Sequence, residues 1–293
     1  MMMKKMWVWM LLTLLTYGRC YGCLEEERIG LLEIKALINP NSIFGHLGDW
    51  TANKEDIANC CDWSMIECDS TTRRVIHLSL AGARDFRLGD WVLNASLFLP
   101  FKELQSLDLN KNRLVGCSEN QGFEVLSSKL RKLNALDLSG NRFSNNFISC
   151  FNGLSSLRSL DLSSNLLKGS ADFYGFKVLS SRLKKLESLR LKMNGYNDSI
   201  FSTLTGFSSL KSLDLSYNQL TGSAGFNGFD ALPSKLRELE SLDLSYNRFN
   251  DSDLSYLCEF PSLKSLNLSG NMFLGSTTIN GKVVNISWPL LAN

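Results

Sequence analysis

Leucines recur along this chain with a fixed spacing. Seven segments follow the pattern L-x-x-L-x-L-x-x-N-x-[L/F/Y], and the clearest reads LKSLDLSYNQL, from Leu210 to Leu220. The seven segments begin at Leu104, Leu133, Leu157, Leu186, Leu210, Leu239 and Leu263, and a degenerate eighth copy begins at Val75. Successive starts are 29 or 24 residues apart. Self-similarity at a fixed period predicts a solenoid, in which each repeat packs only against its neighbours.

Each repeat is predicted to carry one short strand with leucines facing the interior. In the clearest repeat the strand is centred on Ser212–Leu215, and the buried positions are Leu210, Leu213, Leu215 and Leu220. Each buried leucine contributes roughly 1.5–3 kcal/mol of transfer free energy. One strand cannot bury a core alone, so the rungs must stack. Eight strands about 4.8 Å apart form a parallel inner sheet roughly 35 Å long.

A column of asparagines follows the strands, one in each of the seven clear repeats. Its members are Asn112, Asn141, Asn165, Asn194, Asn218, Asn247 and Asn271, and Ala83 takes the place in the degenerate copy. A polar side chain that faces the interior needs hydrogen-bond partners, and an amide offers both donors and an acceptor. We expect this asparagine ladder to pair with the backbone at the bend after each strand, which makes it structural and not catalytic.

The longer steps insert five extra residues on the outer side of the solenoid. Three related segments occur there, GFEVLSSKLRKL from Gly122, GFKVLSSRLKKL from Gly175 and GFDALPSKLREL from Gly228, at intervals of 53 residues. The true unit is therefore a two-rung super-repeat. Apolar residues at helical spacing predict short outer helices on alternate rungs. The fold class is an α/β solenoid with a parallel concave sheet.

Charge excludes one class of partner. The net charge is only +2, so the basic residues of the outer segments are interpreted as a solvated helix face. Nucleic-acid binding is not expected, because basic excess and interleaved aromatic residues are both missing from the sequence.

The ends of the chain differ from the repeats. Residues 1–22 combine Lys4 and Lys5 with an apolar stretch about half as long as a bilayer span, which predicts a secretory signal peptide. The predicted organisation is a signal peptide at 1–22, an amino-terminal cap at 23–74, about eight repeats at 75–281 and an incomplete further repeat at 282–293. We expect no membrane span in this chain, and we interpret it as a truncated part of a longer protein.

Export changes the interpretation of the cysteines. Cys23, Cys60, Cys61 and Cys68 precede the repeats and predict a disulfide framework, although their spacing leaves three pairings open. The spacing matches no paired C-x2-C zinc site. With Cys20 removed, seven cysteines remain, so at least one thiol is free or paired with another chain. For Cys117, Cys150 and Cys258 we favour simple burial, with a Cys117–Cys150 disulfide as the alternative.

At this point the motifs resemble a known family. The segment from Cys23 (CLEEERIGLLEIKALI), LGDW ending at Trp50, and CCDWSMIEC at Cys60–Cys68 are similar to the cap of plant extracellular leucine-rich-repeat proteins. WVLNASLFLPFKELQSLDL, from Trp91, resembles a subgroup of receptor-like proteins that includes a sensor of parasitic plants.

This resemblance implies a horseshoe-shaped leucine-rich-repeat solenoid and the disulfides Cys23–Cys60 and Cys61–Cys68. It also implies an ectodomain at the cell surface that senses a ligand and signals through a kinase-bearing partner. The chain departs from the family in its few rungs and in the half-present L-x-G-x-I-P extension, of which Leu220–Ser223 has the glycine but no Ile-Pro.

A second column predicts where binding occurs. It follows the strand centres and reads Asp108, Asp137, Asp161, Arg190, Asp214, Asp243 and Asn267. Aligned acids suggest a metal or acid–base site. However, Asp is the ordinary rung residue of this family, and we expect no metal, no cofactor and no catalytic residue. The column is broken on the rung that carries Arg190, Lys192 and Met193. Tyr217 and Tyr246 lie on the following rungs, and the acids Asp161, Asp214 and Asp243 surround the break. This combination suits recognition of a peptide, protein or carbohydrate. Drift of a single rung is the alternative.

Five sequons predict glycosylation, at Asn94, Asn197, Asn250, Asn267 and Asn285. A glycan at Asn267 would block the concave strand, unless this rung variant stays bare.

The function predicted from the sequence is a non-catalytic, extracellular ligand-binding ectodomain of a plant receptor-like protein, active in defence or peptide perception. It is expected in the secretory pathway and then in the apoplast, or at the plasma-membrane surface if a longer form is anchored. The alternative is a secreted inhibitor of pathogen enzymes that degrade the cell wall, similar to polygalacturonase inhibitors. An enzyme is not expected, because the two histidines, His46 and His77, lie in no triad pattern.

Overall fold

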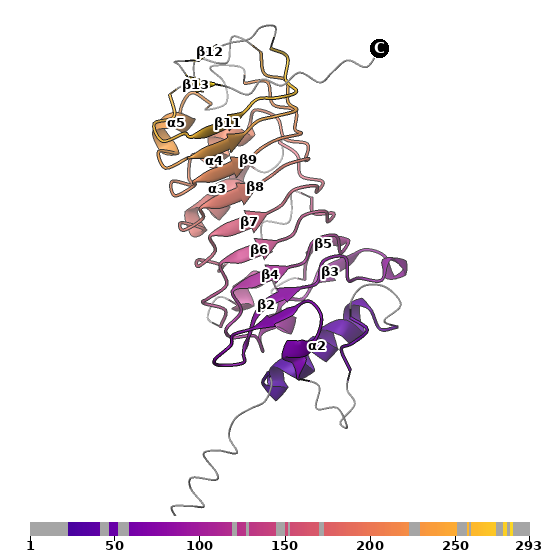
Figure 1. Ribbon diagram of the computed structural model, residues 1–293. Helices are drawn as coiled ribbons and strands as arrows, with labels where there is room; N and C mark the ends of the chain where they lie inside the picture. Colours follow the sequence, from indigo (N-terminus) through magenta and orange to yellow (C-terminus); the bar gives the residue numbers. More distant parts are fainter. Residues whose placement is uncertain are drawn as a thin grey trace, which may run out of the picture.

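The protein is a solenoid of stacked rungs with a helical cap at its amino-terminal end (Figure 1). The computed structural model describes residues 23–41, 47–51, 59–118, 122–126, 129–144, 150–151, 153–169, 173–222, 229–250, 257, 259–273, 278–279 and 282–283. The predicted signal peptide, 1–22, lies outside the described residues, as do most residues of the predicted incomplete repeat.

One nine-stranded sheet runs the length of the solenoid, in the order β1-β2-β4-β6-β7-β8-β9-β10-β11. After the cap strand β1 (Ile66–Cys68), its rung strands are β2 (Val75–Ser79), β4 (Ser106–Asp108), β6 (Ala135–Asp137), β7 (Ser159–Asp161), β8 (Ser188–Arg190), β9 (Ser212–Asp214), β10 (Ser241–Asp243) and β11 (Ser265–Asn267). The rung strands pair in parallel, and equivalent repeat positions face each other.

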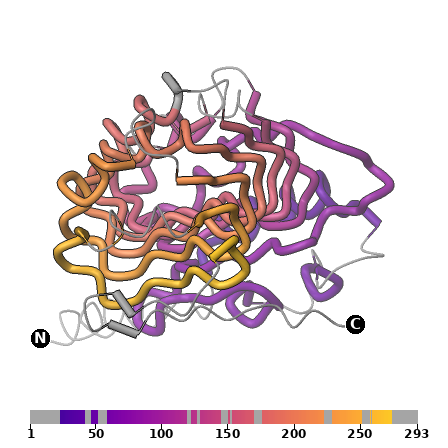
Figure 2. The backbone as a smooth tube through the Cα atoms, turned by 90° about the horizontal axis from the view of Figure 1, so that it is seen from above, coloured from indigo at the N-terminus to yellow at the C-terminus, as the bar shows by residue number. Residues whose placement is uncertain are grey.

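The leucine pattern builds the core as predicted. Leu210, Leu213, Leu215 and Leu220 are buried, and the equivalent residues of the other rungs form one continuous apolar column between the sheet and the outer side. Seen from above in Figure 2, the rungs superpose as nested loops around this column. The predicted solenoid with a parallel concave sheet is therefore confirmed.

The cap covers the first rung. It consists of helix α2 (Glu25–Ile38), the 3-10 turn η1 (Cys60–Asp62) and strand β1, which pairs antiparallel with β2. The disulfides Cys23–Cys60 and Cys61–Cys68, which the family resemblance implied, are both present. Trp50 stacks on Trp63 with ring centroids 5.8 Å apart, so the small cap has an aromatic core of its own.

A second, two-stranded parallel sheet lies on one lateral side of the solenoid, where each rung turns away from its concave strand (Figure 1). It contains β3 (Trp91–Leu93) and β5 (Leu114–Cys117), flanked by the 3-10 turns η2 (Phe86–Leu88) and η3 (Ala95–Phe98). In the later part of the solenoid, neighbouring rungs are joined on this side by one backbone hydrogen bond each, for example from Gly195 N to Leu167 O. At the carboxy-terminal end, β12 (Thr278–Ile279) pairs antiparallel with β13 (Lys282–Val283).

Short helical segments line the outer side. They are the 3-10 turn η4 (Phe123–Leu126) and the α-helices α3 (Phe173–Arg182), α4 (Ile200–Leu204) and α5 (Leu232–Lys235). Three of them lie on long rungs, as predicted. Helix α4 is a difference, because it lies on a short rung, where Ile200, Phe201 and Leu204 have the helical spacing needed to reach the core.

A third disulfide joins Cys117 to Cys150 and corrects the interpretation that both are simply buried thiols. Their Cα atoms are 5.5 Å apart, because adjacent rungs bring the end of β5 against the outer segment that begins at Cys150. Their separation of 33 residues along the chain hides this proximity. Cys258 lies outside the described residues.

The asparagine ladder satisfies the backbone at the bends. Asn218 is typical: its Nδ2 donates to the carbonyl oxygens of Leu191, Leu215 and Ser216 at 3.0–3.1 Å, and its Oδ1 accepts from the Tyr196 N–H at 3.1 Å. The other six members make equivalent bonds between their own rung and the preceding one. Each amide therefore joins two rungs.

Replacing Asn218 with alanine should lower the free energy of unfolding by about 1–3 kcal/mol, because buried carbonyl and N–H groups then lose their partners. Chemical denaturation measures the loss. Gln219→Ala, at the exposed neighbouring position, is the matched control and should change stability by less than about 0.5 kcal/mol. A loss of only a few tenths for Asn218→Ala would contradict a structural role for the ladder.

Candidate functional site

The carboxyl ends of the concave strands carry the predicted acidic column. In each of the five aspartates, Oδ1 accepts the backbone N–H two residues later, for example from Ser163 N to Asp161 at 2.8 Å. The side chain thus caps the turn that leaves the strand. This bond explains why aspartate, or asparagine in the case of Asn267, recurs at the position.

Arg190 breaks this column at the end of β8. It lies in register between Asp161 and Asp214, and its Nη1 is 3.6 Å from Asp161 Oδ2. An arginine cannot accept the turn hydrogen bond, because a guanidinium carries donors alone. Its side chain is 57 % exposed whereas that of Asp161 is 16 % exposed, so the cation stands above the acidic column.

A column of left-handed backbone conformations runs beside the acids, one residue before each ladder asparagine and, in the degenerate first copy, before Ala83. Its members are Gly82, Lys111, Gly140, Ser164, Met193, Tyr217, Tyr246 and Gly270, with φ between 52° and 70°. Glycine adopts this conformation freely, whereas other residues lose roughly 1–2 kcal/mol. On three consecutive rungs, at Met193, Tyr217 and Tyr246, large side chains occupy the strained position and stay 38–49 % exposed.

The two tyrosines of this column form a stack. Their ring centroids are 4.1 Å apart and the rings are tilted by 15°, and Lys192 Nζ lies 5.1 Å from the centroid of Tyr217. On its other side the Tyr246 ring lies against Gly270, where an added Cβ would be 2.7 Å from Cδ1 of Tyr246. The stack therefore ends at a glycine, and both tyrosines remain partly exposed.

The stack changes the acidity of one phenol. Loss of hydration raises the pKa of Tyr217, and the hydrogen bond with Tyr246 and the charges of Tyr246 and Asp243 raise it further. The Tyr217 hydroxyl therefore stays neutral at physiological pH and can donate a hydrogen bond.

We call Arg190, Lys192, Met193, Tyr217 and Tyr246 the aromatic–basic ridge. It combines two cations, a flexible apolar side chain and two amphipathic rings on three consecutive rungs. The chemistry of this surface suits an extended ligand that has apolar and acidic groups. The sequence suggested these residues, but the strained backbone and the ring stack are visible in the structure alone.

The three acids predicted to belong to the site, Asp161, Asp214 and Asp243, lie beside the ridge and have partners of their own. Asp214 and Asp243 use one carboxylate oxygen for their own turns, and Asp243 Oδ2 also accepts from Asn267 Nδ2 at 3.0 Å. Asp161 faces Arg190. Within the part of the chain that the structure describes, no three His, Cys, Asp or Glu side chains are grouped as metal ligands would be.

The opposite edge of the sheet, where the strands begin, has alternating charges that the sequence analysis missed. Glu187 pairs with Arg158 and, at 3.3 Å, with Lys211, and Lys264 pairs with Glu240 at 2.9 Å. The hydrogen bond from Lys211 lowers the pKa of Glu187, with Arg158 acting in the same direction. The signal available in the sequence was the alternation of acidic and basic residues at the second position of the L-x-x-L motif. The charges along this edge therefore offset one another.

The sequons lie on two faces. Asn94, Asn197 and Asn250 lie on the lateral side, whereas Asn267 ends concave strand β11. Asn285 lies outside the described residues.

Comparison with known proteins defines the class. Residues 24–69 match the leucine rich repeat N-terminal domain, and residues 132–154, 208–226, 235–258 and 262–281 match leucine rich repeats. The chain belongs to the leucine-rich-repeat proteins, and the curated relatives it matches include plant receptor-like proteins.

Two of these relatives illustrate the match. Cuscuta receptor 1 of Solanum lycopersicum is 35 % identical over 240 residues, which cover 70 % of this chain and 21 % of the relative. Receptor-like protein 14 of Arabidopsis thaliana is 35 % identical over 93 % of this chain and 27 % of its own length. The chain thus spans about a fifth to a quarter of the length of these relatives.

Solved structures share the fold. The ectodomain of the Arabidopsis receptor kinase GASSHO1/SCHENGEN3, in complex with CASPARIAN STRIP INTEGRITY FACTOR 2, superposes with a TM-score of 0.52 at 26 % identity, over 85 % of this chain and 30 % of that one. The ectodomain of the receptor kinase HAESA gives a TM-score of 0.58 at 23 % identity, over 85 % and 42 % of the two chains. Among the described residues of our chain, no helix is long and apolar enough to cross a bilayer.

Proposed function

We propose that this chain is the ligand-binding part of a plant receptor-like protein and that it has no catalytic activity. The observation that carries the proposal is the aromatic–basic ridge, where exposed rings occupy strained backbone positions beside a break in the acidic column. Exposed strain of this kind lowers stability without burying surface, which favours a functional role. The similarity to receptor-like proteins supports the same function.

The ligand is an extended peptide or an acidic carbohydrate. Its acidic group pairs with Arg190 and Lys192, and its apolar groups lie along Met193 and the edges of the two tyrosine rings. The chain reaches the apoplast through the secretory pathway, signals with a kinase-bearing partner and acts in defence perception. Support for ligand binding comes from the GASSHO1/SCHENGEN3 ectodomain, which was solved in complex with CASPARIAN STRIP INTEGRITY FACTOR 2.

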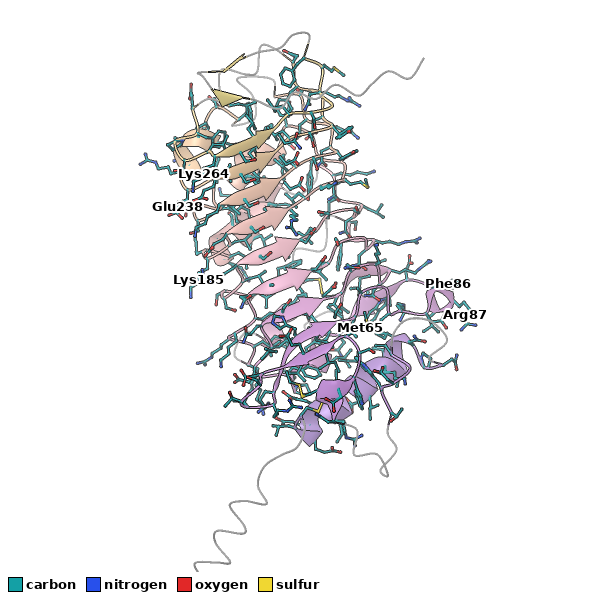
Figure 3. All side chains as sticks on the ribbon, viewed as in Figure 1. Met65, Phe86, Arg87, Lys185, Glu238 and Lys264 are labelled. Atoms are coloured by element: carbon teal, nitrogen blue, oxygen red, sulfur yellow. A yellow bond between two sulfur atoms is a disulfide. The ribbon has the colours of Figure 1, made fainter. Side chains whose placement is uncertain are left out.

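The test uses two probes, an arrayed library of random dodecapeptides and a series of oligogalacturonides, each applied to the purified chain. Arg190→Asp should weaken the binding of the best probe at least about 10-fold, and Tyr217→Ala should have a similar effect, since central aromatic and arginine residues contribute about 1.4 kcal/mol or more each. Lys185→Asp is the matched control. It makes the same charge change on an exposed residue at the opposite edge of the sheet (Figure 3) and should leave binding unchanged.

The proposal is contradicted if no probe binds, or if Arg190→Asp and Lys185→Asp weaken binding equally. A polygalacturonase assay with the purified chain separates the inhibitor alternative, because a receptor fragment should leave the hydrolysis rate unchanged.

A further inference from the structure

Two sequons occupy the same structural position on the lateral side. Asn197 and Asn250 each lie three residues after a ladder asparagine and directly after a buried aromatic residue, Tyr196 or Phe249. The carbonyl oxygens of these two aromatic residues accept the backbone bonds that continue the lateral side from rung to rung. Both asparagines are exposed. Asn94 directly follows β3 of the lateral sheet and begins η3.

The local geometry of Asn94 and Asn197 leaves the amide nitrogen available. In each, Oδ1 accepts from the N–H and the hydroxyl of the serine that completes the sequon, with N–H distances of 3.0 Å at Ser96 and 3.2 Å at Ser199. The hydrogen bonds of both side chains thus use the oxygen. Among the described residues, their Nδ2 atoms, to which the sugar is attached in N-glycosylation, make no hydrogen bond.

Asn267 makes the same turn but uses its nitrogen as well. Its Oδ1 accepts from the N–H and the hydroxyl of Ser269, and its Nδ2 donates to Asp243 Oδ2 at 3.0 Å. The residue pairs in register with Asp243 on the neighbouring strand, so a sugar on Nδ2 would stand on the concave sheet beside that carboxylate.

We propose that N-glycans cover the lateral side at Asn94, Asn197 and Asn250, and that Asn267 remains unmodified, which keeps the concave face open. In each modified residue the oligosaccharide moves from a dolichyl pyrophosphate donor to Nδ2. The C1–N bond forms, the C1–O bond to the pyrophosphate breaks, and Nδ2 gives up one proton. The proposal rests on the secretory route of the proposed function.

Site-resolved mass spectrometry tests the pattern. The chain is secreted from plant cells in culture, and its peptides are treated with peptide-N-glycosidase in H₂¹⁸O, which converts each glycosylated asparagine into labelled aspartate. We expect label at Asn94, Asn197 and Asn250 and none at Asn267. Label at Asn267, or unlabelled lateral sites beside a labelled Asn267, would overturn the inference. A secreted chain without label at the lateral sites would also overturn the inference, whereas a chain that stays inside the cells would instead remove the secretory route of the proposed function.

Two single substitutions provide matched gain-of-site controls. Lys168→Asn creates a sequon at 168–170, three residues after the ladder residue Asn165 and therefore in the lateral position of Asn197, one rung earlier. Asp214→Asn creates a sequon at 214–216 on a concave strand, in the position of Asn267. We expect one additional glycan on the first variant and none on the second. The reverse outcome would show that fold position does not select the sites.

Discussion

Replacing Arg74 with alanine should lower the free energy of unfolding by about 3–5 kcal/mol, one of the two largest effects we expect in this chain. Arg74 Nε lies 3.0 Å from Oε1 of Glu27, which is fully buried in cap helix α2, while Glu27 Oε2 accepts the N–H of Val75 at 3.4 Å. Glu27 thus joins the cap to the first rung. Without Arg74 its carboxylate is buried without a counter-ion.

This effect should depend on pH. Burial raises the pKa of Glu27 above its ordinary value of 4.5, and the hydrogen bond and charge of Arg74 oppose that rise. A carboxyl group with a raised folded-state pKa contributes stability that is fully present below the unfolded pKa and is lost as the pH rises through the folded pKa. Arg74→Ala removes the opposing influence, so the pKa of Glu27 in the folded state should rise further, and the stability of the variant should fall more steeply as the pH rises above 4.5.

Urea unfolding followed by tryptophan fluorescence, to which Trp50 and Trp63 of the cap contribute, measures this change. Glu27→Gln should flatten the pH dependence, and Glu27→Gln combined with Arg74→Ala should recover part of the lost stability. Arg28→Ala, which removes the exposed ion pair with Glu25, is the control and should cost less than about 1 kcal/mol. A loss for Arg74→Ala that is below 1 kcal/mol and independent of pH would contradict the role of this pair.

Removing the Cys117–Cys150 disulfide should lower the free energy of unfolding by about 3.5–4 kcal/mol. The bond closes a loop of 33 residues, and loop-closure entropy of the unfolded chain gives a value of this size. Cys117→Ala with Cys150→Ala is the appropriate variant, because alanine brings no hydroxyl group into the buried position of Cys150. The adjoining ring pair, Phe123 and Phe151 at 5.7 Å, is expected to loosen first.

Thermal and urea unfolding of the oxidised protein provide the measurement, and a thiol titration provides the control. The three disulfides use six of the eight cysteines, and Cys20 leaves with the predicted signal peptide, so the denatured, unreduced mature chain should expose one thiol, from Cys258. Three thiols would show that Cys117 and Cys150 are unpaired. An unchanged urea midpoint in the double variant would contradict a stabilising role.

Part of the candidate site could be predicted from the sequence. Aligning the repeats places Arg190 among aspartates and Tyr217 beside Tyr246, because equivalent positions of a solenoid become neighbours one rung apart. The left-handed position before the ladder asparagines was not predicted, although glycine recurs there at Gly82, Gly140 and Gly270 and was the available signal for positive φ. Tyrosine and methionine at the same position carry no such signal. The alignment also carried no information on how the two tyrosine rings pack, and it did not predict helix α4 on a short rung.

The sequence by itself determined the rungs, their parallel register, the buried leucine column and the asparagine ladder. Those features depend on a local pattern that repeats at fixed intervals, so each copy supports the same interpretation. The tertiary structure decided the Cys117–Cys150 bond, the burial of Glu27 against Arg74, the tyrosine stack and the engaged amide of Asn267. Each of these depends on the distance between side chains from different rungs or from the cap, and only the packed backbone sets that distance.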